Sequence, residues 1–127
     1  SSAASDVYKR QIDDWAILGG YAGVNQFLTV GAHAMIGGMT HISNDVPAYM
    51  IVSGRPATVR SVNTIGLERR GFDKESIAEI REAFKILYKR NYSLQEAIDQ
   101  IRVLSENCAP LTALVASLES SKKGIHR

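Results

Sequence analysis

The sequence contains few cysteines and prolines and no long apolar run. Its one cysteine, Cys108, excludes an intrachain disulfide and favours a reducing compartment. No apolar stretch approaches the roughly 20 residues that cross a bilayer, and the first residues lack the apolar core of a signal peptide, so we expect no membrane insertion. With 15 basic and 13 acidic residues, the net charge of +2 is too small to indicate nucleic-acid binding.

What the sequence does contain is a six-residue repeat from Ile12 to Val46. An aliphatic residue opens every hexad, and a small residue often follows four places later. A period of six matches neither a helix nor an alternating strand. It is typical of a parallel β-helix with triangular coils, in which the opening residues point inward and stack on their copies. These residues are Ile12, Leu18, Val24, Val30, Ile36 and Ile42.

Glycine follows the opening residue at Gly19, Gly31 and Gly37. We expect it to relieve crowding at the corner of the coil, where a side chain would cost strain. A glycine-rich antiparallel β domain with accidental phasing is the alternative interpretation of the repeat.

Six hexads make about two coils, fewer than the three or so that a stack of repeats usually needs. The coils are therefore predicted to be the end of a longer stack. Residues 1–11 do not fit the repeat, and we interpret them as a leader foreign to the family; a native polar tail is the alternative. Residues 12–56 would form the coils, with a last strand from Tyr49 to Gly54.

The rest of the chain changes character twice. Residues 57–72 are predicted to be a connector rich in arginine, and residues 73–127 a small helical domain. Asp73 can cap a helix from Lys74 to about Arg90, and Ser93 with Glu96 forms a capping box for a second helix. Pro110 can begin a third. The predicted fold class is mixed β and α, the end of a left-handed parallel β-helix followed by an antiparallel helical domain.

The connector also carries a motif. Residues 63–72 read N-T-I-G-L-E-R-R-G-F and resemble the N-x-x-G-L-x-R-R-G-F signature of the UDP-N-acetylglucosamine O-acyltransferases. Two further stretches, G-A-H-A-M at 31–35 and D-V-P at 45–47, are similar to the same family. The resemblance runs from about Ile12 to Arg127.

The resemblance implies a reaction. In this family a 3-hydroxyacyl chain moves from acyl carrier protein to the 3-hydroxyl of UDP-N-acetylglucosamine, the first step of lipid A synthesis, in the cytoplasm of Gram-negative bacteria. A neutral histidine in an H-x-x-H-D motif serves as the general base, because imidazole titrates near the working pH. His33, His41 and His126 do not match that motif. We therefore expect this chain alone to transfer no acyl group.

The resemblance also implies roles for residues that are present. Gly20 would use its backbone N–H to stabilise the thioester oxyanion, and Gln26 would lie near the substrate. Gly38 would line the end of the acyl channel and leave room for a long chain. The remaining matches are to the nucleotide: Asn63 to the uridine or ribose, and Arg69 and Arg70 to the phosphates, which guanidinium groups bind through paired hydrogen bonds.

Acyl carrier protein, UDP-N-acetylglucosamine and two further copies in a homotrimer are the partners that the resemblance implies, with no cofactor. Acyl carrier protein is acidic, and a complementary basic surface is predicted at Arg55, Arg60, Lys85, Lys89 and Arg90. Trp15 and Tyr21 are predicted to be surface or interface aromatics, and the methionines to be packing residues.

Three alternatives stay open. One is the related N-acyltransferase of the same pathway, and another is a non-catalytic hexapeptide-repeat protein. The third is a carbonic anhydrase of the γ type, which binds zinc through three histidines. Because His33 and His41 are eight residues apart, they occupy different phases of the hexad and would point in different directions, so no metal site is expected.

Overall fold

The computed structural model describes residues 10–122 and 124–127. Residues 1–9 of the predicted leader lie outside the described residues, whereas its last residue, Gln11, already pairs with Thr29. Six short strands begin at intervals of six residues: β1 Gln11–Ile12, β2 Ile17–Leu18, β3 Gly23–Val24, β4 Thr29–Val30, β5 Met35–Ile36 and β6 His41–Ile42.

The strands pair in parallel with copies one coil further along the chain. Ile12 lies beside Val30, Leu18 beside Ile36 and Val24 beside Ile42, an offset of eighteen residues, or three hexads, in each case. The resulting sheets, β1-β4, β2-β5-β7-β8 and β3-β6, form the three faces of a prism. The predicted left-handed parallel β-helix, with three hexads to each coil, is confirmed.

The opening aliphatic residues point into the prism, as predicted. Val30, Ile36 and Ile42 are fully buried, and the residues four places after an opening residue share this core: Leu28, Ala34, Thr40 and Val46. Leu18 is 40% exposed because, among the described residues, no coil lies beyond the first one. Of the methionines predicted to pack, Met50 is buried, but Met35 and Met39 are exposed.

The corners of the coils differ from the prediction. Left-handed backbone recurs every six residues, but at non-glycine residues with φ between 59° and 66°: Trp15, Tyr21, Phe27, His33 and Met39. The glycines instead lie where two coils touch. A Cβ built on Gly31 would lie 2.5 Å from the backbone nitrogen of Ala48, and one on Gly19 would lie 2.5 Å from that of Gly38. The glycines therefore leave room for the backbone of the adjacent coil, whereas nearby non-glycine residues adopt the strained left-handed backbone.

The prism ends in an antiparallel pair. Strand β7, Met50–Ser53, confirms the expected last strand, and β8, Thr58–Val62, folds back along it. The six-residue helix α2, Thr64–Arg69, follows directly. The sequence described residues 57–72 only as a connector. The sequence pattern did not predict this strand because it packs on β7 at the edge of the sheet, and only one of its five residues, Val62, is buried.

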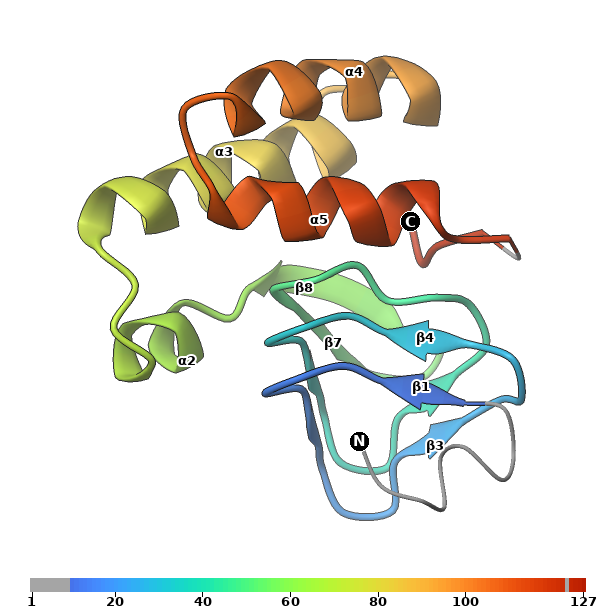
Figure 1. Ribbon diagram of the computed structural model, residues 1–127. Helices are drawn as coiled ribbons and strands as arrows, with labels where there is room; N and C mark the ends of the chain where they lie inside the picture. The colour runs from blue at the N-terminus through green and yellow to red at the C-terminus, as the bar shows by residue number, and fades with distance from the viewer. Residues whose placement is uncertain (1–9, 123) are drawn as a thin grey trace.

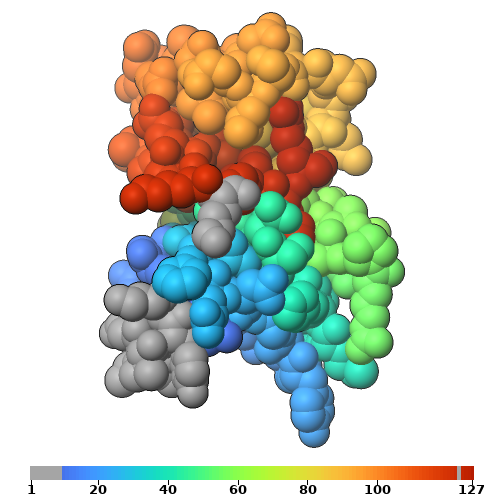
Figure 2. Space-filling model, turned by 90° about the vertical axis from the view of Figure 1, so that its right-hand side faces the viewer, coloured from blue at the N-terminus to red at the C-terminus, as the bar shows by residue number. Residues whose placement is uncertain are grey.

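Three helices complete the chain as predicted: α3 Lys74–Tyr88, α4 Leu94–Ser105 and α5 Pro110–Glu119. Asp73 caps α3, Ser93 and Glu96 form a complete capping box, and Pro110 begins α5. Figure 1 shows these helices lying across one side of the prism, with α5 nearest to it and α2 apart from them. The space-filling view shows the same two layers, helices over coils (Figure 2).

The C-terminal tail ties the two layers together. Ile125 is buried and forms a parallel bridge with Asp45, at the corner that follows β6. The Tyr88 hydroxyl of α3 donates a hydrogen bond to the His126 carbonyl oxygen, 2.7 Å away. The tail therefore contacts the last coil through Ile125 and contacts α3 through His126, and in this way it joins the two layers. No helix in the described part of the chain is long and apolar enough to cross a membrane.

Candidate functional site

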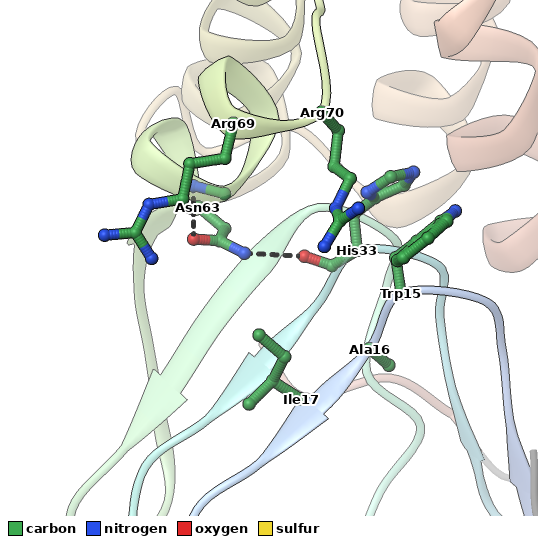
Figure 3. A pocket seen from close by; sticks show the side chains of 8 residues that line it. Trp15, Ala16, Ile17, His33, Asn63, Arg69 and Arg70 are labelled. Carbon is green, nitrogen blue, oxygen red and sulfur yellow. Dashed lines mark hydrogen bonds between the residues drawn. The ribbon is translucent and has the colours of Figure 1, made fainter.

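A hollow of about 210 Å³, partly open to solvent, lies at the prism corner that follows β1 and β4, next to α2. It is lined by Trp15, Ala16, Ile17, His33, Asn63, Gly66, Arg69 and Arg70 (Figure 3). All three predicted nucleotide-binding residues, Asn63, Arg69 and Arg70, thus line one hollow.

Three rings form a column along this corner. Trp15, His33 and Tyr49 come from successive coils and all have left-handed backbone. The His33 ring stacks on Trp15 with centroids 6.5 Å apart and on Tyr49 with centroids 5.8 Å apart. Phe72 meets His33 edge-on at 5.0 Å. His33 is therefore packed inside an aromatic column of its own chain.

The column is anchored at its inner end. The Tyr49 hydroxyl donates a 2.6 Å hydrogen bond to the Pro110 carbonyl at the start of α5. Burial and the nearby Cys108 raise the pKa of Tyr49 to about 12, so the phenol stays protonated as a donor. The corner is therefore fixed to the helical layer as well as to the coils.

Charge at this corner is concentrated on the arginines. Burial, and then the positive charge of Arg70, lower the pKa of His33 below its usual 6.5, while Asp14 partly opposes them. His33 is therefore neutral near pH 7. The Arg70 guanidinium carbon lies 3.7 Å from the centroid of the Trp15 ring, a cation–π contact.

Asn63 connects α2 to the corner. Its side-chain oxygen accepts a hydrogen bond from the Gly66 backbone N–H at 3.2 Å, which caps α2, and its side-chain nitrogen donates to the His33 carbonyl at 2.9 Å. A Cβ on Gly66 would lie 2.4 Å from that nitrogen, so only glycine leaves room for the cap. Asn63 is buried, and its structural role is to hold the two arginines beside the hollow.

The side chains of Arg69 and Arg70 point in different directions. Both are exposed at the end of α2. Figure 3 shows the Arg70 side chain pointing toward Trp15 and His33, while Arg69 points away on the other side of Asn63. A bound group would therefore have to lie between them to contact both.

The remaining predicted site residues lie at the other two corners. Gly20 and Gly38 share the corner after β2 and β5, where the Met39 N–H donates to the Gly20 carbonyl at 2.8 Å. A Cβ on Gly38 would lie 3.2 Å from that same oxygen. Gln26 is exposed at the corner after β3. A single chain thus does not unite these residues with the hollow, and their roles stay predictions.

Sequence reasoning missed Trp15 and His33 as lining residues. Trp15 was correctly expected at the surface and is 57% exposed. The signal that could have found the column is the eighteen-residue spacing of Trp15 and His33, which places them at one corner of adjacent coils. His41 lies on a different face, beside Gly23. The described residues contain no group of three or more His, Cys, Asp or Glu side chains that could hold a metal.

This architecture, a parallel β-helix of hexads covered by a helical layer, places the chain among the hexapeptide-repeat proteins. A family model described as UDP-N-acetylglucosamine O-acyltransferase, domain 2, matches residues 45–126. The chain belongs to this family. The match favours the O-acyltransferase over the other readings of the repeat.

Individual relatives agree with the family match. An acyl-[acyl-carrier-protein]–UDP-N-acetylglucosamine O-acyltransferase from Burkholderia orbicola is 43% identical over 121 residues, which cover 92% of this chain and 46% of the relative. The structure of LpxA from Acinetobacter baumannii aligns with a TM-score of 0.90 at 39% identity, over 93% of this chain and 46% of that one. The Francisella novicida UDP-N-acetylglucosamine acyltransferase aligns with a TM-score of 0.91 at 36% identity, over 94% and 44%. The chain therefore spans about half the length of these relatives.

Proposed function

We propose that this chain forms the sugar-nucleotide-binding end of an enzyme that moves a 3-hydroxyacyl chain from acyl carrier protein to the 3-hydroxyl of UDP-N-acetylglucosamine, the first step of lipid A synthesis. The relatives' names supply the acyl carrier protein and the sugar nucleotide. The observation that carries the proposal is the hollow beside α2, where two exposed arginines flank the buried Asn63. Guanidinium groups are suited to phosphate because they donate charge-assisted hydrogen bonds in a fixed fork.

The proposed reaction is a transfer of an acyl group from sulfur to oxygen. The sugar hydroxyl loses its proton to a general base and attacks the thioester carbon, and the carbon–sulfur bond breaks as the carrier's thiol leaves. Because no histidine of this chain matches the H-x-x-H-D motif, the base would come from a part of the enzyme that this chain does not contain. We expect a turnover assay on the 127-residue chain alone to detect no product.

The arrangement of the predicted residues is consistent with a site shared between copies. Gly20 and Gly38 lie at one corner, Gln26 at another and the arginines at the third, so copies packed around a threefold axis would be needed to bring different corners together. In this proposal Gly20 stabilises the oxyanion, Gln26 lies near the substrate and Gly38 borders the acyl chain.

The five residues predicted to form a basic surface for acyl carrier protein differ in their contacts. Arg90 forms an ion pair with Glu82, and the Arg60 guanidinium donates hydrogen bonds to Ser53. Arg55, Lys85 and Lys89 form no ion pair with the other described residues. We propose that the acidic carrier binds at Arg55, Lys85 and Lys89. We also propose that the enzyme is cytoplasmic, which cell fractionation would check.

Titration of UDP-N-acetylglucosamine into the purified chain tests the nucleotide site. We expect Arg69→Gln and Arg70→Gln each to weaken binding about tenfold or more, because a hydrogen bond to a charged group contributes about 1.5–3 kcal/mol. Arg81→Gln, which removes an exposed charge on α3, is the matched control and should leave the affinity unchanged. An unmodified chain that binds no nucleotide, or variants that bind as well as it does, would contradict the proposal.

A further inference from the structure

Trp15 occupies a corner position of the same kind as Tyr21, Phe27 and Met39. It has left-handed backbone at a φ of 63° and is 57% exposed, although a bulky side chain gains little from either condition. Its ring contributes little to the core of the prism. What the ring does contact is the Arg70 guanidinium, 3.7 Å from its centroid, at the wall of the hollow.

The Trp15 ring is held in place by the residues on which it stacks. Beneath Trp15 lie His33 and then Tyr49, and the Tyr49 hydroxyl is bonded to the start of α5. Phe72, two residues after Arg70, packs edge-on against both His33 and Tyr49. The chain that carries Arg70 is thus docked on the same column whose outer end its guanidinium covers.

We propose that Trp15 is a positioning residue for Arg70: its indole ring holds the guanidinium over the hollow in the orientation that meets a phosphate of the sugar nucleotide. A long arginine side chain loses rotamer freedom when it binds a ligand. A side chain already held on an aromatic face has less freedom to lose, so affinity rises. The inference rests on the proposed nucleotide site and assigns a residue that acts on it through Arg70.

The stack itself can be measured without ligand. Trp15 is the single tryptophan of the chain, so fluorescence excited at wavelengths that the tyrosines do not absorb reports on it alone. We expect Arg70→Gln to change the emission of Trp15, whereas Arg69→Gln, which removes the neighbouring charge that points away, leaves it unchanged. Identical emission in the chain and in Arg70→Gln would overturn the stack in solution.

Nucleotide titration then tests what the stack does. Calorimetry on the full chain should show that Trp15→Leu binds UDP-N-acetylglucosamine about two- to fivefold more weakly, the size of an exposed cation–π contact. In a chain that already carries Arg70→Gln, adding Trp15→Leu should cause no further loss, because the role of Trp15 depends on Arg70. Tyr21→Leu is the matched control, since Tyr21 occupies the same left-handed position at the next corner, at a φ of 59°.

The outcomes separate the two proposals. No binding to the unmodified chain refutes the nucleotide site, and the positioning role with it, even if the fluorescence result stands. An equal loss from Trp15→Leu with and without Arg70 overturns the positioning role alone, because a merely structural residue would act independently of the arginine. Trp15→Phe, which keeps an aromatic face, should retain most of the affinity and replaces the leucine variant if that does not fold.

Discussion

At the scale of single residues, different positions of the hexad make the left-handed turn and the close contact between coils. The sequence pattern had assigned both to glycine. The left-handed turn at each corner is made by a residue with a side chain, such as Tyr21, which is 95% exposed. The neighbouring glycines are needed for a different reason, since the backbone of the next coil passes within a methyl group's reach of Gly31. The position of a glycine therefore shows where two coils touch, and the exposed side chains show where the chain turns.

Substitution of two glycines tests whether contact between coils explains why glycine is needed. Gly31→Ala would place a methyl group 2.5 Å from the Ala48 nitrogen, so we expect a loss of about 3 kcal/mol in the free energy of unfolding, at the upper end for overpacking. Gly20→Ala, with no atom within 4 Å of the new methyl group, should change it by less than about 0.5 kcal/mol. Urea denaturation of both variants measures this, and equal losses would show that contact between coils does not decide the role.

At the scale of elements, the tail at residues 124–127 joins the helices to the last coil, and we call this segment the clasp. The His126 ring nitrogen Nε2 accepts hydrogen bonds from the backbone N–H groups of Ser43 and Asn44, at 3.3 and 3.2 Å. The Asp45 carboxylate binds Thr29 N–H and the Ser121 hydroxyl. A ring nitrogen can accept these bonds only when it carries no proton, so the clasp requires neutral His126.

This requirement predicts a pH dependence of stability. Burial lowers the pKa of His126 below its usual 6.5, and Asp45 only partly opposes the shift. The folded chain then binds fewer protons than the unfolded chain, so the stabilisation is complete above pH 6.5 and is lost as the pH falls through the folded pKa. His33, whose pKa is also lowered, acts in the same direction.

Thermal unfolding between pH 7.5 and 5.5 checks the clasp. The unmodified chain should melt at a lower temperature as the pH falls, and His126→Gln should show a shallower dependence, because an amide oxygen accepts the same two hydrogen bonds without titrating. Equal slopes for the two proteins would mean that the histidine in the clasp is not responsible.

At the scale of the whole molecule, the exposed apolar side chains lie mainly along the prism and its corners. Trp15, Tyr21, Phe27 and Met39 are each more than half exposed. Side chains of this kind, gathered on a flat-sided prism, favour contacts with further copies. The same three corners carry the predicted site residues, so the proposed assembly would bring copies together next to the proposed site.

Sedimentation measures the assembly directly. We expect a mass about three times the 13.9 kDa of the chain, and a shift toward one-third of that mass in Phe27→Ser. Val103→Ser, which removes an equally exposed side chain from α4, should leave the mass unchanged. A monomer at all concentrations would contradict the trimer for this chain.

The sequence alone predicted the coils, three of the helices and the family. The hexads predicted the coils, because inward residues recur at a fixed spacing, and the caps at Asp73 and Ser93 predicted their helices because a cap depends on residues three places apart. The signature at residues 63–72 predicted the family and brought three lining residues of the hollow into view.

Only the tertiary structure decided which of these residues meet. The column of Trp15, His33 and Tyr49 and the bond between His126 and Ser43 join residues that lie apart in the chain, up to 83 positions for the last. Such contacts depend on how coils stack and where the tail returns, and short-range patterns carry no information about either. For the same reason the sequence could name Gly20, Gln26 and Arg70 together, while the prism sets them at three separate corners.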